Sequence, residues 1–311
     1  MKILLLEKLA LVPKVETYLR KHGFQIIMES DLTTNSVGDI SVIWSGVRRL
    51  IDLNFVENFP NLKFLCFPTT GLTHVKLASR HQSIKIISLS EKKHLLSKIT
   101  STAELAIMFI LMSLRRFSEV DTDIKEGNWR RENFVGNSFN SIKLGILGLG
   151  RLGSKVAEVS AIFGADVYYS DISDKETNFK RVSTAELFDV CDVISIHTPY
   201  SRENRKFVSK KLLARSKSNL AIINTARGEL IDEDAVCEWL SKSSDRQYLT
   251  DVLTGEESFI NSKIDPKHFD LLNKNNVIVT PHIGGACHGN FEYTQMLIAD
   301  DLILESKKNE T

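Results

Sequence analysis

The chain has 311 residues, of which 42% are hydrophobic and 25% charged, so it is long enough to form two domains with separate cores. A formal net charge of +1 gives no overall field that would gather nucleic acid or an anionic membrane, and we expect neither partner. The four cysteines contain no CxxC pair, which favours free thiols in a reducing compartment over zinc ligands or disulfides.

The N-terminal sequence MKILLLEKLALVP is apolar, but Glu7 and Lys8 interrupt it and no small-residue cleavage site follows. We therefore expect a buried first strand rather than a signal peptide. The longest other apolar run, residues 105–114, is too short to cross a bilayer. These features predict a cytoplasmic protein.

Short apolar runs alternate with helical patterns in the first part of the chain, which predicts a parallel sheet covered by helices. Pro13 and Gly23 frame the first helix, in the usual order of proline at the start and glycine past the end. The expected strands of this part are residues 3–6, 24–28, 40–44, 64–67 and 84–87.

The pattern changes near Thr100. Residues 102–117 predict one long helix that is apolar on more than one face, followed by a polar stretch. A second alternation begins at Lys143, and Ser183 with Glu186 predicts a capped helix start. The expected strands are residues 144–147, 166–169, 193–197, 220–224, 248–252 and 277–280.

The last helix, after Gly285, has no strand left to serve in the second part, so we assign it to the first domain. The predicted fold class is α/β, with two doubly wound parallel-sheet domains. One comprises residues 1–98 plus 284–311 and the other residues 99–283, and we expect the active site in the cleft between them.

The segment 148–153 has the form GxGxxG, with Gly148, Gly150 and Gly153 as the glycines and Arg151 and Leu152 between them. It follows an expected buried strand and opens a helix that ends at Gly164. The expected apolar face of that helix is Leu152, Val156, Val159 and Phe163. Glycines let a backbone approach a pyrophosphate, and a helix N-terminus supplies amide donors.

Asp171 follows the next expected strand, near the spacing at which an acid binds an adenosine ribose. A glycine-rich turn without a ligand is the alternative, but strand, turn, helix and acid together favour a Rossmann dinucleotide site. The charge of Asp171 would repel the extra phosphate of NADP, so we expect NAD as the cofactor.

Three later strands each end in polar residues: Arg227 after the first, Asp251 and Glu256 after the second, and His282 after the third. Arginine recognises a carboxylate with two parallel hydrogen bonds, and histidine is the usual proton donor near neutral pH. Taken singly, each residue has an ordinary structural explanation, such as a surface ion pair or a helix cap. Their occurrence at equivalent strand ends of one domain favours catalysis.

These segments resemble the D-isomer-specific 2-hydroxyacid dehydrogenase family, and the resemblance is closest to the branch that contains phosphoglycerate, glycerate and formate dehydrogenases. Segments 101–104 and 127–130 share it. The resemblance implies that His282 is the catalytic acid and base and that Glu256 is its catalytic partner. It implies that Arg227 is a catalytic residue that binds both substrate and cofactor, and that His282 likewise contacts both. It also implies that Asp251 holds the nicotinamide carboxamide.

Further cofactor-binding positions implied by the resemblance are His197, Thr198, Pro199, Thr225 and Ala226. The family also implies a flavodoxin-like substrate domain, a Rossmann NAD-binding domain, and a homodimer formed mainly through the NAD-binding domains.

The substrate side of the predicted site is less defined. Thr70 and Gly71 resemble a family loop whose backbone amides bind the substrate carboxylate, although the family's acids are replaced by Thr73 and Lys76. Two further sets of basic residues stay open in their roles: Arg48 with Arg49, which fit either a phosphate site or an exposed helix start, and His94, which precedes the long helix. The histidines show no metal-ligand spacing, so we expect no metal.

The sequence therefore predicts an enzyme that transfers a hydride between NAD(H) and a small 2-hydroxy or 2-oxo acid, of phosphoglycerate, glycerate or sugar-acid type. The alternative is an NAD-sensing binding protein on the same fold, similar to transcriptional corepressors, because fold alone does not decide function.

Overall fold

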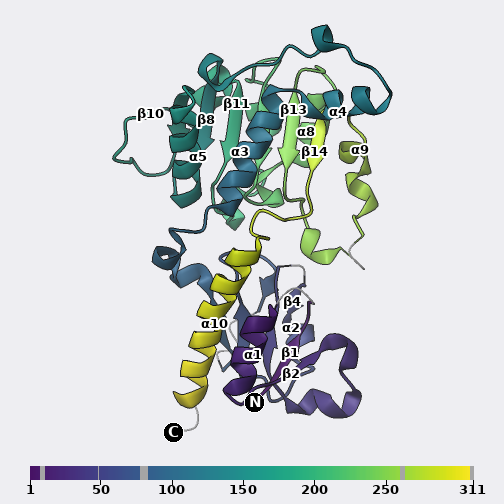
Figure 1. Cartoon of the computed structure of the whole chain (residues 1–311), viewed down its shortest axis with the longest axis vertical. Coiled ribbons are helices and arrows are strands. Elements are labelled where there is room, and N and C mark those ends of the chain that lie inside the picture. The colour runs from purple at the N-terminus through teal and green to yellow at the C-terminus, as the bar shows by residue number, and fades with distance from the viewer. Residues whose placement is uncertain (8–10, 48, 78–82, 260–262, 309–311) are drawn as a thin grey trace. The chain divides into compact units, whose positions relative to one another are not determined.

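The computed structural model describes residues 1–7, 11–47, 49–77, 83–259 and 263–308 (Figure 1). The chain divides into two compact units, each treated by itself below. The first unit contains Met1–Ile99, Glu257–Phe259 and Ala286–Thr311, and the second contains Thr100–Glu256 and Ile260–Gly285.

A parallel five-stranded sheet forms the first unit, in the order β2-β1-β3-β5-β7. Counted within the unit this is the order 2-1-3-4-5 of flavodoxin-like folds, as the sequence predicted. The strands are β1 (Lys2–Leu5), β2 (Gln25–Met28), β3 (Ile40–Trp44), β5 (Phe64–Phe67) and β7 (Lys85–Ser88). A separate two-stranded sheet pairs β4 (Ile51–Asp52) with β6 (Val75–Lys76).

The helices of the first unit are α1 (Pro13–Lys21), α2 (Leu53–Val56) and α10 (His288–Lys308). On one face of the sheet, α1 and α10 contribute Leu19, Ile298 and Leu302 to a core with the sheet residues Ile3 and Trp44. The short 3-10 helices that the structure describes in this unit are η1 (Glu29–Asp31), η2 (Thr34–Asp39), η4 (Leu89–Glu91) and η5 (Lys93–Leu96).

A parallel seven-stranded sheet forms the second unit, in the order β10-β9-β8-β11-β12-β13-β14 (Figure 1). The strand order reverses beside β8, which confirms the predicted Rossmann arrangement. The strands are β8 (Lys143–Leu147), β9 (Asp166–Ser170), β10 (Lys180–Arg181), β11 (Val193–Ile196), β12 (Ala221–Asn224), β13 (Gln247–Thr250) and β14 (Val277–Val279). The ends of the last three are in register, with Asn224 opposite Thr250 and Thr250 opposite Val279.

Helices α3 and α5 pack on one face of this sheet, where Phe109, Ile110 and Val156 share a core with Ile146 and Ile223. The helices of the unit are α3 (Ser101–Leu114), α4 (Phe117–Lys125), α5 (Arg151–Ile162), α6 (Thr184–Val190), α7 (Lys210–Leu213), α8 (Glu233–Leu240) and α9 (Phe269–Leu272). Its 3-10 helices, within the described ranges, are η6 (Arg131–Asn133), η7 (Phe139–Ser141), η8 (Arg202–Asn204), η9 (Gly228–Leu230) and η12 (Pro266–His268), while η10 (Glu256–Ser258) begins in this unit.

The single helix expected over residues 102–117 is wrong. Helix α3 ends at Leu114, and Arg116 takes a left-handed conformation (φ 48°) that starts α4 in a new direction. The carbonyl of Leu114 accepts a hydrogen bond from the N–H of Asn137 at 2.9 Å instead of continuing the helix. Arg116 is fixed by two hydrogen bonds to Glu119.

The expected apolar face of α5 is also partly wrong. Its buried positions are Gly153, Val156, Ala157 and Ser160, whereas Phe163 lies past the helix end and is 60% exposed. Phe163 stacks on Phe139 instead of joining the core, with a distance of 5.5 Å between ring centroids.

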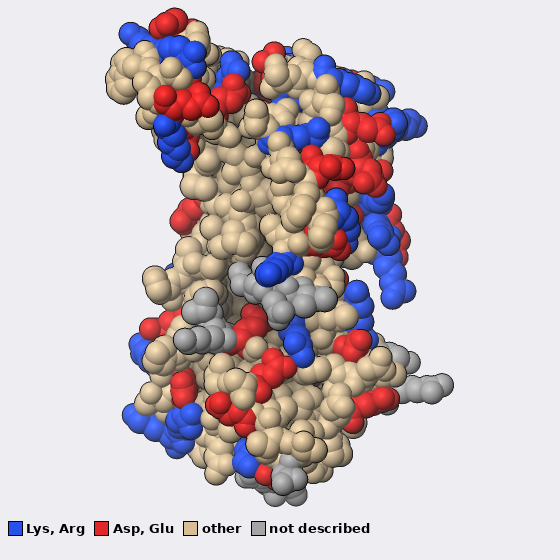
Figure 2. Space-filling model, turned by 90° about the vertical axis from the view of Figure 1, so that its right-hand side faces the viewer, with Lys and Arg blue, Asp and Glu red and all other residues tan. Residues whose placement is uncertain are grey.

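Among the helices that the structure describes, none is both long and apolar enough to cross a membrane. On the face drawn in Figure 2, basic and acidic side chains are interspersed, as the near-zero net charge leads one to expect.

Candidate active site

The glycine loop follows β8 and has the close packing that its sequence requires. A Cβ atom on Gly153 would lie 2.1 Å from the carbonyl oxygen of Gly148, and Gly148 itself has a φ of +94°. A Cβ atom on Gly150 would meet nothing within 4 Å. The loop is therefore tight between its outer glycines and open at Gly150, the N-cap of α5, where a pyrophosphate would approach. Leu152 packs against the core.

Asp171 ties the end of β9 to this loop. Its Oδ2 accepts the Leu149 N–H at 2.9 Å, and its Oδ1 accepts the Ser173 N–H at 3.0 Å. Burial opposes ionisation, but the Ser173 and Leu149 N–H groups and the Lys175 ammonium, 3.6 Å away, hold the pKa of Asp171 below its usual value. The carboxylate that the sequence assigns to the ribose is thus charged and fixed in position. The sequence interpretation missed Lys175.

The segment after β11 lies against the glycine loop, since a Cβ on Gly148 would come within 2.9 Å of the Thr198 backbone nitrogen. Thr198 donates its hydroxyl to the Leu147 carbonyl at 3.1 Å. Nε2 of His197 lies 2.9 Å from the Ser195 hydroxyl, and burial lowers the pKa of His197 to about 4. His197 is therefore neutral near pH 7, and Pro199 follows in the same loop.

After β12, the side chain of Asn224 holds the loop that carries Arg227. Its Oδ1 accepts the Ala226 N–H and its Nδ2 donates to the Arg227 carbonyl, both at 3.0 Å. The Arg227 side chain is half-buried and donates to the Ala226 carbonyl at 2.6 Å. Within the described residues, the buried Thr225 hydroxyl has no hydrogen-bond partner, which suits a position lining a ligand. The sequence interpretation missed the role of Asn224, although its place directly after a buried strand is a usable signal.

Asp251, after β13, organises the loop that carries His282. It is only 1% exposed, and its carboxylate accepts the Thr280 hydroxyl at 2.5 Å and the N–H groups of Ile283 and Gly284, each at 2.7 Å. Burial raises the pKa of Asp251, against the opposing effect of these donors. His282 has a left-handed backbone (φ 55°), and its N–H donates to the Asp251 carbonyl at 2.8 Å. Such a conformation is uncommon outside glycine and is held here by the surrounding bonds.

The side chains of His282 and Glu256 meet through Nδ1 of the imidazole and Oε1 of the carboxylate. The other carboxylate oxygen, Oε2, accepts the Leu253 N–H at 3.2 Å. Both side chains keep about a fifth of their surface exposed, at 20% and 23%. With Nδ1 engaged by the carboxylate, Nε2 is the ring nitrogen left to exchange a proton with a bound molecule.

The predicted substrate-side positions Thr70 and Gly71 belong to the first unit, as does His94, whose role the sequence leaves open. Thr70 and Gly71 follow β5, where the Thr69 hydroxyl donates to the Gly71 carbonyl at 3.2 Å. They belong to a different unit from Arg227, so their shared role with it stays a prediction. His94 is exposed on η5.

Arg48 lies outside the described residues, whereas Arg49 pairs with Glu29 at 2.9 Å and lies over the Phe55 ring. These contacts give Arg49 a structural explanation.

Residues 107–284 match the family profile described as "D-isomer specific 2-hydroxyacid dehydrogenase, NAD binding domain". The chain belongs to this family. The match confirms the predicted resemblance and identifies the second unit's sheet as part of an NAD-binding domain.

The chain is similar in sequence to curated proteins that are named as dehydrogenases and reductases. It is 30% identical to a D-3-phosphoglycerate dehydrogenase of Haemophilus influenzae, over 83% of this chain and 62% of that protein. It is 28% identical to a hydroxypyruvate reductase of Thermotoga maritima, over 80% of this chain and 78% of the relative. The chain thus spans about three fifths of the first relative's length.

The fold is shared with solved structures. A D-lactate dehydrogenase of Aquifex aeolicus, solved with NAD and lactic acid, superposes with a TM-score of 0.81 at 22% identity, over 99% of this chain and 94% of that one.

Proposed function

We propose that this chain is an NAD-dependent D-2-hydroxyacid dehydrogenase that interconverts a small 2-hydroxy acid and its 2-oxo acid. The contact between His282 and Glu256 carries the proposal, because it joins a proton-transferring side chain to a carboxylate at neighbouring strand ends of an NAD-binding domain. In the same domain, Arg227 supplies a cation that can bind a carboxylate.

The cofactor site we propose consists of the glycine loop with Asp171, the loops at 197–199 and 225–227, and the residues Asp251 and His282. The opening at Gly150 and the unpartnered hydroxyl of Thr225 support this assignment. When bound, the nicotinamide supplies or accepts the hydride. The charge of Asp171 favours a free ribose hydroxyl over a phosphate, and therefore NAD over NADP.

In the proposed reduction, Arg227 binds the substrate carboxylate and polarises the 2-oxo group, while His282 donates a proton from Nε2 to the developing alkoxide. The Glu256 carboxylate holds Nδ1 and stabilises the imidazolium form. In the oxidation, neutral His282 accepts the hydroxyl proton at the same nitrogen. We assign the substrate domain to residues 1–98 plus 284–311, the NAD-binding domain to residues 99–283, and the substrate-carboxylate amides to Thr70 and Gly71.

The substrate we propose is of phosphoglycerate, glycerate or sugar-acid type, in keeping with the reactions that the relatives' names describe. A panel of 2-oxo acids, including glyoxylate, hydroxypyruvate, phosphorylated acids and sugar-derived acids, scored by NADH oxidation, tests the activity and ranks the substrates. Absence of turnover with every acid would contradict the proposal. The corepressor-like alternative has no support among the relatives reported above.

Two further parts of the proposal concern the oligomeric state of the enzyme and its location in the cell. We infer a homodimer formed through the NAD-binding domain, because exposed apolar side chains occur along α3, α4 and the segment that follows. They are Met108, Leu111, Phe117, Ile124 and Trp129. We also infer a cytoplasmic location, supported by four cysteines that are all free.

A further inference from the structure

The turn that leads into Glu256 is tied to the segment that follows Arg227. The N–H of Thr254 donates to Oε1 of Glu233 at 2.8 Å, and the N–H of Gly255 donates to Oε1 of Glu229 at 3.1 Å. Both acceptors are carboxylates, which make stronger hydrogen bonds to backbone N–H groups than neutral oxygens do. Two successive peptide groups of the turn are therefore held by side chains that are distant in sequence.

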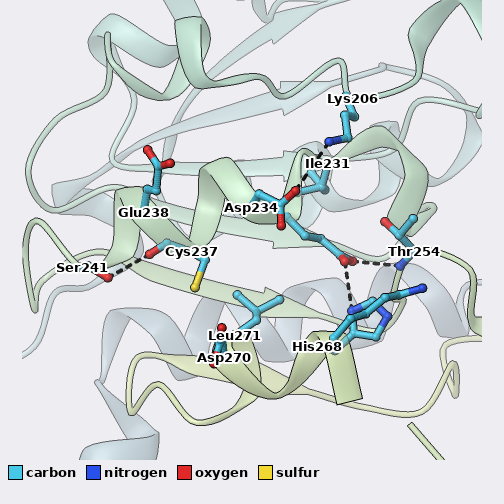
Figure 3. Close-up of a pocket in the computed structure, with 12 residues that line it drawn as sticks. Lys206, Ile231, Asp234, Cys237, Glu238, Ser241, Thr254, His268, Asp270 and Leu271 are labelled. Carbon is cyan, nitrogen blue, oxygen red and sulfur yellow. Dashed lines mark hydrogen bonds and ion pairs between the residues drawn. The ribbon is translucent and has the colours of Figure 1, made fainter. Parts of the chain in front are cut away.

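The second oxygen of Glu233 is also engaged. Its Oε2 lies 3.0 Å from Nδ1 of His268, a side chain that is only 2% exposed. Figure 3 shows His268 and Thr254 joined by dashed lines to the same carboxylate, that of Glu233. An acid at the first position of a helix ordinarily interacts with that helix's own N-terminus. Here both oxygens bond outside α8, one to the turn and one to η12.

The two carboxylate oxygens of Glu256 likewise bind two different partners. One oxygen accepts the N–H of Leu253, in the same turn, and the other meets Nδ1 of His282. The turn 253–255 therefore lies between two histidine–glutamate pairs, His268 with Glu233 and His282 with Glu256. Its backbone links the two glutamates, because Glu233 accepts a hydrogen bond from the turn and Glu256 follows it in sequence.

The backbones themselves are in contact at this point. A Cβ atom on Gly228 would lie 2.2 Å from the Leu253 carbonyl carbon and 2.3 Å from the Thr254 nitrogen. The turn has no room to move toward Gly228, and the hydrogen bonds to the two carboxylates oppose its movement away.

We propose that Glu229 and Glu233 are positioning residues, which hold the turn 253–255 so that the Glu256 carboxylate stays against His282. The inference rests on the proposed function, since it names further residues that serve the same proton transfer. His268 supports the arrangement by fixing the second oxygen of Glu233. An orientation error of a fraction of an ångström at a catalytic group is enough to lower turnover, so a remote anchor can affect the rate.

The first test is a double-mutant cycle on turnover with NADH and the best 2-oxo acid of the panel. In the wild-type background, Glu233→Ala should lower kcat by roughly threefold to tenfold, because one charge-assisted hydrogen bond is lost, and leave the KM for NADH unchanged. In the Glu256→Ala background, which lacks the side chain that the turn positions, the same substitution should have little further effect, because Glu233 acts through Glu256. An equal loss in both backgrounds would overturn the inference.

The matched control is Glu238→Ala. Glu238 lies on the same helix, and its carboxylate pairs with Lys210 at 2.6 Å. It should leave kcat unchanged. Glu233→Gln retains an oxygen that can accept the Thr254 N–H, so it should recover most of the activity lost in Glu233→Ala. Should Glu233→Ala fail to fold, Glu229→Ala takes its place in the cycle, because it leaves the contact between Glu233 and His268 intact.

The second test does not depend on activity. The imidazole ¹⁵N resonances of His282, assigned by their loss in His282→Asn, should shift in Glu233→Ala and Glu229→Ala toward their positions in Glu256→Gln. They should stay in place in Glu238→Ala. Unmoved resonances in both anchor variants would overturn the inference even in an active enzyme. If the wild type turns over no 2-oxo acid, the proposed function fails, and the resonances alone decide whether the anchors position Glu256.

Discussion

The backbone of Gly228 touches the backbone of Leu253, with room for no more than a hydrogen atom between them, because a Cβ at residue 228 would lie 2.2 Å from the Leu253 carbonyl carbon. Gly228→Ala should therefore force the two loops apart. We expect a loss of roughly 1–3 kcal/mol in the free energy of unfolding, the usual cost of an added methyl group in a packed site. Urea unfolding measures it.

The matched control is Gly289→Ala in α10, where an added Cβ meets nothing within 4 Å. That substitution should leave the stability unchanged or raise it slightly, since alanine favours a helix. Equal stabilities of the two variants would show that the contact at Gly228 is not restrictive.

The proposed proton transfer predicts different effects at His282 and Glu256. His282→Asn should preserve NADH binding and lower turnover by roughly 10²–10⁴-fold, the usual range for lost acid–base catalysis. Glu256→Gln should cost less, because the imidazole keeps a hydrogen-bond partner. Binding by NADH fluorescence and turnover by absorbance separate the two effects. Near-normal turnover of His282→Asn would exclude the mechanism.

Asp171 predicts the choice of cofactor. The wild type should use NADH with much higher kcat/KM than NADPH, and Asp171→Ala should weaken NADH binding about tenfold or more, the effect of losing one charge-assisted bond. Part of that loss would come from the freed Leu149 N–H and Lys175, which Asp171 now engages. Equal wild-type efficiency with both cofactors would contradict the assignment.

His197 predicts a dependence of stability on pH. Burial lowers its pKa from 6.5 to about 4 in the folded chain, so between these values the unfolded chain binds the proton more readily. Stability should therefore fall as the pH drops from 6.5 toward 4, by up to about 1.4 kcal/mol per pH unit from this group. His197→Asn should flatten that part of the profile measured by urea unfolding. The control is His94→Asn, which replaces an exposed histidine elsewhere in the chain and should leave the slope of stability against pH as it is in the wild type. An identical slope in wild type and His197→Asn would rule out the effect.

The apolar side chains along α3 predict the oligomeric state. Met108 and Leu111 are 43% and 44% exposed, whereas Ala106, Phe109 and Ile110 on the same helix are buried within the second unit. Sedimentation at micromolar concentration should show a dimer for the wild type and a monomer for Leu111→Lys. Ile172→Lys removes another exposed apolar side chain and should stay dimeric. A wild-type protein that sediments as a monomer would contradict the proposed homodimer.

The longer strands could be predicted because they are buried apolar runs such as Phe64–Phe67. The two-residue strands β4, β6 and β10 were not predicted, because runs that short carry no apolar pattern. The break at Arg116 could not be predicted either, because its left-handed conformation belongs to a non-glycine residue, and the group that captures the Leu114 carbonyl comes from Asn137. The spacing of apolar residues along the sequence indicates neither the left-handed conformation nor this hydrogen bond. Arg227, Glu256 and His282 stood out through their places after strands and through the family resemblance.

Glu229, Glu233 and His268 did not stand out, since in the sequence they are ordinary polar residues that match no motif. Their relation to the turn 253–255 depends on side-chain contacts between segments far apart along the chain. Such contacts are set by the three-dimensional fold and leave no pattern in the sequence.

The matched ends of β12, β13 and β14, where Asn224, Thr250 and Val279 stand in line, have a consequence for how this family member can change over time. The connections at the opposite end of the sheet, such as residues 241–246 between α8 and β13, can lengthen at small thermodynamic cost. One residue inserted within β13 would instead displace everything after it by about 3.3 Å and turn alternate side chains to the opposite face. Asp251 would then leave the Thr280 hydroxyl. We expect sequence drift to accumulate as insertions between strands, while the lengths of these three strands stay fixed.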